Sequence, residues 1–184
     1  KSSIARAWSG LARVSPVSGR DRLDLLLPRG WPESLAAVGW RWRRRGGEES
    51  GAVHELDKLP DAARRAEVHV WTPAADTMFT TTALPTRAPR KIAQALPYAL
   101  EDRLLGDPDS LHFAWRREDD GTLLVAVTGR ARLQGWTDLL TRAGLKPVSI
   151  CPATLLVPWA LDYWSAAFVD GELLVRTGAV SGFV

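Results

Sequence analysis

Alternating apolar positions at the start of the chain predict a β-meander. Three leucines fall on one face of residues 22–27, and the alternation resumes in residues 39–45 after a turn at residues 28–30. Two glycines at residues 46–47 end the second strand, and a short third strand is expected around residues 53–56.

The second of these strands separates its tryptophans from half of its arginines. The period of two places Trp40, Trp42 and Arg44 on one side. The other side, which we expect to be solvated, carries Arg41, Arg43 and Arg45. Glu48 and Glu49 follow just beyond the turn, where they would pair with these arginines.

Helical signals and a fourth strand come next. Residues 60–66 predict a helix with Asp61 near its start and two arginines near its end, as the helix dipole favours. Residues 68–71 predict a strand. Three strands, a helix and a strand are the opening order of a ribonuclease-H-like or actin-like half-domain.

The longest predicted helix, residues 87–105, follows a threonine-rich strand at residues 77–84. Its apolar residues recur every four positions and form one stripe, made of Ile92, Leu96, Leu100 and Leu104. Pro97 is expected to kink the helix because proline removes an amide donor. Gly106 is expected to close the helix at the C′ position.

The remaining pattern predicts two hairpins, one helix and one further strand. The helix covers residues 130–143 and ends at Gly144, and the strand covers residues 146–150. The hairpins pair residues 111–117 with 122–128, and 163–169 with 172–177. The sequence stops soon after the second hairpin, and we expect this stop to lie inside a longer protein.

Charge is unevenly distributed along the 184 residues, which carry 24 lysines and arginines against 21 acids. Four of these cations and no acid lie in residues 1–20, which we expect to form a flexible basic arm. The rest of the chain is nearly neutral. This balance disfavours a general surface for polyanions.

Nucleotide chemistry is the main enzymatic alternative, as an actin-like ATPase or a sugar-kinase relative. Such enzymes place an aspartate at the end of the first strand before a glycine-rich turn, and a second loop adds further amides for the phosphates. Here Asp24 lies inside the strand, Gly30 alone follows in the turn, and Asp170 begins an ordinary tight turn. We therefore expect no catalytic residue and no cofactor, and leave nucleotide binding without turnover open.

The three histidines do not predict a metal site. His54, His69 and His112 are scattered, and none lies one helical turn from another ligand. Cys151 is the only cysteine, so no disulfide can form within the chain, and its setting predicts a small buried core residue.

The stretch at residues 40–45 is the candidate for nucleic-acid binding, because aromatic rings stack on bases and arginines hold phosphates. The same arginines are explained by a solvated strand face that discourages edge pairing. We therefore expect no nucleic-acid partner.

Residues 84–114 carry a family resemblance. They read LPTRAPRKIAQALPYALEDRLLGDPDSLHFA, with a leucine-proline pair, a basic helix start, an ALPYALED segment, an acidic loop and an LHFA strand. This order resembles type II secretion system protein L, also called general secretion pathway protein L. With weaker counterparts at residues 143–145, 151–152 and 170–178, the resemblance covers Arg22 to Val184.

The resemblance implies a strand-rich α/β fold, an actin-like variant that does not hydrolyse nucleotide and is here incomplete at the C-terminus. It implies a scaffold that binds the N-terminal domain of the hexameric secretion ATPase. In the family a membrane helix follows, then a periplasmic domain that pairs with protein M. The chain would thus be a soluble fragment from the cytoplasmic face of the bacterial inner membrane, and a homodimer is left open.

In this fold, residues 21–76 and 146–162 are expected to form the first actin-like half. Residues 77–145 would form an inserted α+β subdomain, and residues 163–184 the start of a second half. Cations at the start of a helix are unfavourable for the helix itself, which suggests that they serve a partner. The predicted ATPase-binding residues are Arg87, Arg90, Lys91, Glu101 and Arg103.

Overall fold

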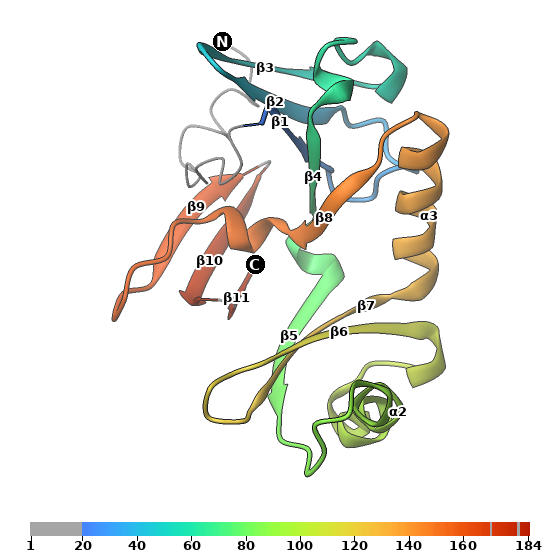
Figure 1. Cartoon of the computed structure of the whole chain (residues 1–184), viewed down its shortest axis with the longest axis vertical. Coiled ribbons are helices and arrows are strands. Elements are labelled where there is room, and N and C mark those ends of the chain that lie inside the picture. The colour runs from blue at the N-terminus through green and yellow to red at the C-terminus, as the bar shows by residue number, and fades with distance from the viewer. Residues whose placement is uncertain (1–19, 170, 180) are drawn as a thin grey trace. The chain divides into compact units, whose positions relative to one another are not determined.

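The computed structural model describes residues 20–169, 171–179 and 181–184, and it divides into two compact units. Of the described residues, the first unit contains those from Arg20 to Ala75 and those from Trp136 onward, and the second contains Asp76–Gly135 (Figure 1). The predicted basic arm lies, apart from Arg20, outside the described residues. Among the described helices, none is long and apolar enough to cross a membrane.

The first unit is built on a five-stranded sheet with the order β3-β2-β1-β4-β8. Its strands are β1 (Arg22–Leu26), β2 (Val38–Arg44), β3 (Gly47–Val53), β4 (Glu67–Thr72) and β8 (Pro147–Pro152). β1, β2 and β3 are antiparallel, β4 runs parallel to β1, and β8 runs parallel to β4. An antiparallel meander followed by parallel strands is what the ribonuclease-H-like prediction requires, so the predicted fold class is confirmed.

The two faces of this sheet differ in polarity. One face carries the buried side chains of Leu23, Leu25, Val68 and Val70. Because successive strand residues point to opposite faces, Asp24 and its neighbours lie on the other face.

A second, three-stranded sheet completes the first unit. Its antiparallel strands are β9 (Ser165–Val169), β10 (Glu172–Gly178) and β11 (Ser181–Phe183), in the order β11-β10-β9. One apolar cluster joins the two sheets, and it is made of Leu26, Trp71, Ala74, Ala153, Leu156, Val157, Val169 and Leu174. Gly182 is required by close packing, since a Cβ there would overlap the Val175 carbonyl and the Thr154 methyl.

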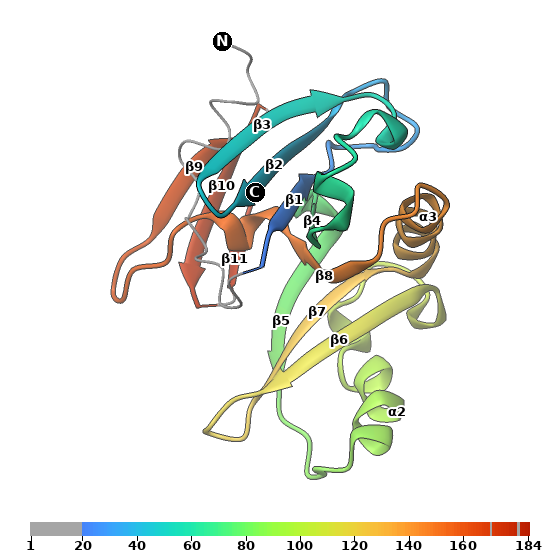
Figure 2. The ribbon, with the colours of Figure 1, turned by 45° about the horizontal axis from the view of Figure 1, so that its top comes forward.

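The second unit packs one helix on one face of an antiparallel sheet. The sheet contains β5 (Thr77–Thr82), β7 (Leu123–Gly129) and β6 (Leu111–Arg117), in that order, and the helix is α2 (Pro89–Ala99) (Figure 2). The buried side chains of α2 meet alternate residues of β7, and this core contains Ile92, Leu96, Leu100, Leu123, Val125 and Val127. After β7, helix α3 (Arg130–Arg142) returns the chain to the first unit and ends before Gly144, as predicted.

The third strand and the first helix differ from the prediction. Gly46, with φ of 100°, makes a tight turn, so β3 pairs with β2 from Gly47 onward rather than beginning at residue 53. Residues 60–66 contain only a 3₁₀ turn, Ala63–Arg65, instead of an α-helix. The sequence pattern also missed β11.

The longest predicted helix is shorter than expected. α2 ends at Ala99, two residues after Pro97, and a 3₁₀ turn at Glu101–Arg103 follows. Pro97 thus lies in the last turn of α2 and not in the middle of a longer helix. Gly106 lies beyond the 3₁₀ turn and does not cap α2.

Candidate functional site

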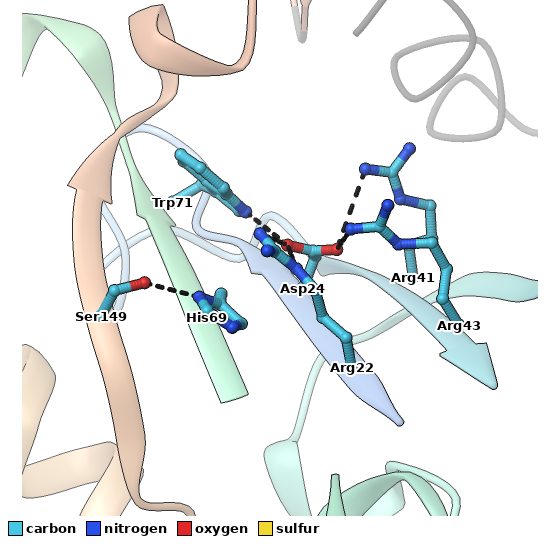
Figure 3. A network of polar contacts seen from close by, with 7 residues as sticks. All are labelled: Arg22, Asp24, Arg41, Arg43, His69, Trp71 and Ser149. Atoms are coloured by element: carbon cyan, nitrogen blue, oxygen red, sulfur yellow. Dashed lines mark hydrogen bonds and ion pairs between the residues drawn. The ribbon is translucent and has the colours of Figure 1, made fainter. Parts of the chain in front are cut away.

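The polar face of the five-stranded sheet holds an ionic cluster centred on Asp24 in β1 (Figure 3). The Arg22 guanidinium donates two hydrogen bonds to Asp24 Oδ1, from Nε at 2.9 Å and from Nη2 at 2.7 Å. The Trp71 indole, from β4, donates to the same oxygen at 2.9 Å. On the other oxygen, Arg43 Nη2 donates at 2.8 Å, and Arg41 Nη2 lies 3.8 Å away.

This cluster lies inside the protein. Asp24 is 0% exposed and Arg41 is 2% exposed. Burial alone would raise the pKa of Asp24, but the hydrogen bonds from Arg22 and Trp71 and the charges of Arg22 and Arg43 outweigh it. The pKa of Asp24 is therefore lowered, and the carboxylate acts as the anion that holds the buried arginines in place.

The prediction that Arg41, Arg43 and Arg45 lie on a solvated face is wrong for two of the three. Alternation does place Arg41 and Arg43 opposite Trp42, but the two guanidiniums face Asp24 rather than water. Arg45 alone is exposed, at the β2–β3 turn, where Arg44 also pairs with Glu49. Arg41 and Arg43 are therefore engaged by a carboxylate and are not open to a phosphate, which leaves fewer arginines in this stretch for the nucleic-acid alternative.

The two loops that would hold phosphate in a nucleotide-binding relative line a small cavity of about 260 Å³. Leu27 and Arg29 line it from the first loop, and Gly171 and Glu172 line it from the β9–β10 turn. Its other walls are apolar and consist of Leu26, Pro73, Ala74, Ala153, Val169 and Leu174. Arg29 Nη1 lies 3.2 Å from Glu172 Oε1, so the two charged side chains that line this cavity neutralise each other.

Backbone amides around the first loop are also in use. The amide of Leu27 donates to the carbonyl of Trp71 at 2.9 Å, and that of Trp31 donates to Pro28 at 3.1 Å. Pro28 has no amide hydrogen. A phosphate cradle needs converging free amides, so this loop offers little of one. Asp170, which we weighed for the same role, lies outside the described residues.

One row across the sheet contains the residue types of a hydrolase triad, namely Asp24, His69 and Ser149. The geometry does not form one. His69 Nδ1 lies 2.7 Å from Ser149 Oγ, but the Asp24 oxygens receive Arg22, Arg43 and Trp71. A triad needs the carboxylate to orient the imidazole. Burial lowers the pKa of His69, with the charge of Arg22 acting in the same direction.

The surroundings of His54 and Cys151 indicate no catalytic or metal-binding role. His54 Nδ1 lies 3.1 Å from the Leu35 carbonyl, at the edge of an open hollow of about 470 Å³. Cys151 is partly buried against the core, and burial raises the pKa of its thiol, which disfavours a nucleophilic role. Within the described residues, no three His, Cys, Asp or Glu side chains are grouped to hold a metal.

The predicted partner-binding residues all lie on the exposed side of the segment around α2. Arg87, Arg90, Lys91 and Glu101 are exposed. Arg103 is exposed too, but its Nη1 donates to the Thr81 carbonyl at 3.0 Å, so it also fastens the 3₁₀ turn to β5. Tyr98 and Leu105, which the sequence analysis did not single out, are 81% and 98% exposed.

Arg22 and Trp71 are the site residues that sequence reasoning missed. A usable signal existed for Arg22, because an arginine two positions before a buried strand aspartate lies on the same face. Trp71 gave no such signal. Its contact with Asp24 spans 47 residues and depends on the parallel pairing of β1 with β4.

A family model described as type II secretion system protein L matches residues 42–184. Protein L of Dickeya chrysanthemi is 28% identical over 158 residues, which covers 85% of this chain and 40% of that protein. Protein L of Pectobacterium carotovorum is 31% identical over 185 residues, covering 94% and 43%. The chain thus spans about two fifths of the length of these curated relatives.

A solved structure agrees with these sequence matches. It is the cytoplasmic domain of EpsL, an inner-membrane component of the type II secretion system of Vibrio cholerae, which superimposes with a TM-score of 0.76 at 25% identity. The match covers 89% of this chain and 70% of that one. The predicted resemblance is confirmed: this chain belongs to the family of type II secretion system protein L.

Proposed function

We propose that this chain is a non-catalytic scaffold that recruits the secretion ATPase to the inner-membrane platform, at the cytoplasmic face. The observation that carries the proposal is the occupation of Asp24 by three arginines and an indole. Asp24 Oδ1 accepts hydrogen bonds from Arg22 and Trp71, Oδ2 accepts one from Arg43, and the surrounding guanidinium charges disfavour the binding of a metal cation there. Membership in the protein L family indicates a role in the type II secretion system. The engagement of Asp24 by arginines favours a role in binding over a role in catalysis.

The exposed segment around α2 is the proposed contact for the N-terminal domain of the ATPase. Its basic start consists of Arg87, just before α2, and of Arg90 and Lys91 in the first turn of α2, which contains no acid. About two turns later Tyr98 projects into solvent, and a rigid aromatic side chain is a typical anchor of a protein interface. A basic rim around an aromatic anchor fits an acidic partner surface with an apolar pocket.

Other partners belong to the same proposal. Contacts with protein M and with the membrane platform would be made by parts of protein L outside this chain. A homodimer is a further candidate, which sedimentation of this chain would test.

The test is a calorimetric titration of this chain with the N-terminal domain of the ATPase from the same organism. We expect saturable binding that the double variant Arg90→Glu/Lys91→Glu weakens by about ten-fold or more, because the charges of the basic rim are reversed. The matched control is Arg45→Glu/Lys146→Glu, which makes the same change in net charge at two exposed residues of the first unit.

Equal weakening by both double variants would show a general charge effect and would contradict the α2 contact. A parallel titration with magnesium-ATP tests the alternative of a nucleotide-binding relative. Heat from magnesium-ATP, together with absence of binding to the ATPase domain, would replace the scaffold proposal by that alternative.

A further inference from the structure

The chain crosses between its two compact units twice. The first crossing, between Ala75 and Asp76, lies in the 3₁₀ turn Ala74–Asp76 directly before β5. The second lies inside α3, between Gly135 and Trp136. A rigid helix would couple the two units stiffly at the second crossing. The residues of α3 at this crossing therefore decide how far one unit can reorient relative to the other.

α3 is attached to a different unit on each side of this crossing. Before it, Arg132 Nη2 lies 3.8 Å from the Asp76 carboxylate, within the second unit. After it, Trp136 is 1% exposed and its indole donates to the Trp31 carbonyl at 3.1 Å, within the first unit. The attachment of the helix changes within a little more than one turn, and Gly135 lies between the two anchors.

Nothing in the packing around Gly135 requires glycine. A Cβ at this position would meet no atom within 4 Å, and the backbone is helical, without a positive φ. At Gly182, by contrast, the packing does require glycine, because a Cβ atom there would overlap neighbouring atoms. In the interior of a helix, glycine is less favourable than alanine because it leaves the backbone more freedom. Local backbone freedom is therefore the property that Gly135 contributes.

We propose that Gly135 is a hinge, and that α3 bends there so that the unit Asp76–Gly135 reorients as a body relative to the first unit. The turn at Ala74–Asp76 would absorb the accompanying change in the other crossing. Hinges of this kind concentrate the change in φ and ψ at a few residues between anchored segments. The inference does not depend on the proposed ATPase contact.

The test compares this chain with its Gly135→Ala variant by pulsed electron paramagnetic resonance. Spin labels are placed at Asp61→Cys in the first unit and Gln94→Cys in the second, both exposed, in a Cys151→Ala background. We expect a broad distance distribution in the parent and a narrower one in Gly135→Ala. Amide exchange in the middle of α3 should slow by about five-fold in the variant, because alanine strengthens the helix.

The matched control is Thr141→Ala, which also raises helix propensity in α3 but lies wholly within the first unit. We expect it to leave the distance distribution unchanged. Equal widths in the parent and in Gly135→Ala would overturn the hinge, as would amide exchange around Gly135 that does not respond to alanine. Equal narrowing by Thr141→Ala would overturn it too, because the effect would then not be local to the crossing.

Discussion

One group of arginine side chains in the first unit lies inside the protein around Asp24, whereas another group, in the second unit, lies on the exposed side of α2. Arg22, Arg41 and Arg43 share one carboxylate and are almost withdrawn from water. The side chains of Arg87 and Arg90, by contrast, are exposed and make no hydrogen bond to a described residue. The same residue type is thus held by a buried carboxylate in the Asp24 cluster and left exposed to solvent at the start of α2.

The difference separates what each region contributes. A buried charge is tolerated only with a partner, so the Asp24 cluster is tied to the folding of the sheet. Exposed cations add little to stability and stay available for an incoming surface. Substitutions in the Asp24 cluster should therefore change the free energy of unfolding. Substitutions on α2 should change the affinity for the ATPase domain.

The largest expected effect comes from Asp24→Asn. The change keeps the shape of the side chain but leaves three buried arginines without their anion, and breaking a buried pair costs about 3–5 kcal/mol. Urea unfolding at pH 7 measures the loss. Glu49→Gln is the control, because it breaks the exposed pair with Arg44 and should cost less than about 1 kcal/mol.

The pH dependence gives an independent check on Asp24→Asn. Because the pKa of Asp24 is lowered in the folded state, its contribution is complete above the unfolded pKa of about 3.9. It is lost as the pH falls through the folded value. The parent and Asp24→Asn should therefore converge in stability in acid. A difference that stays constant from pH 7 to acid would contradict the ionic role of Asp24.

A smaller effect is expected from Trp71→Phe, for which Trp42→Phe is the matched control. Each tryptophan is 7% exposed, but only Trp71 donates to a described residue, Asp24, whereas Trp42 Nε1 has no partner among the described residues. A hydrogen bond to a charged group contributes about 1.5–3 kcal/mol. Trp71→Phe should be more destabilising than Trp42→Phe by roughly this amount in urea unfolding, and equal losses would mean that packing alone sets the effect.

Strand alternation predicted much of the fold but not the use of its polar face. The period of two correctly set Arg41 and Arg43 apart from Trp42, and correctly placed Asp24 inside β1. The error was to read an arginine-rich face as solvated. Pairing of β1 with β2 places Asp24 opposite Arg41, and the register of this pairing, set across the long connection between the two strands, leaves no local pattern.

For the helices, too, the sequence predicted what depends on local spacing and missed what depends on contacts with other elements. The four-residue spacing correctly predicted the buried stripe of α2, because that stripe depends only on periodicity. The end of α2 was misplaced by several residues, since the apolar spacing continues to Leu104 after the backbone has left the helix near Pro97. The attachment of Arg103 to β5 also escaped prediction, because it depends on how the helix lies against the sheet.

The smallest expected effect is that of Arg103→Ala, which combines the two uses of arginine. Its guanidinium holds the Thr81 carbonyl at 3.0 Å at an exposed site, so its removal should lower stability by only about 0.5–1 kcal/mol. Arg87→Ala is the control, since Arg87 makes no hydrogen bond to a described residue and should leave stability unchanged.

Calorimetric titration with the ATPase domain would then separate the roles of Arg103. If Arg103 chiefly fastens the turn Glu101–Arg103 to β5, Arg103→Ala should weaken binding less than Arg90→Glu/Lys91→Glu does. An affinity loss equal to that of the double variant, with stability unchanged, would instead make Arg103 a direct contact. Arg103 would then belong with Arg90 among the partner-binding arginines of the second unit, and not with the structural arginines around Asp24.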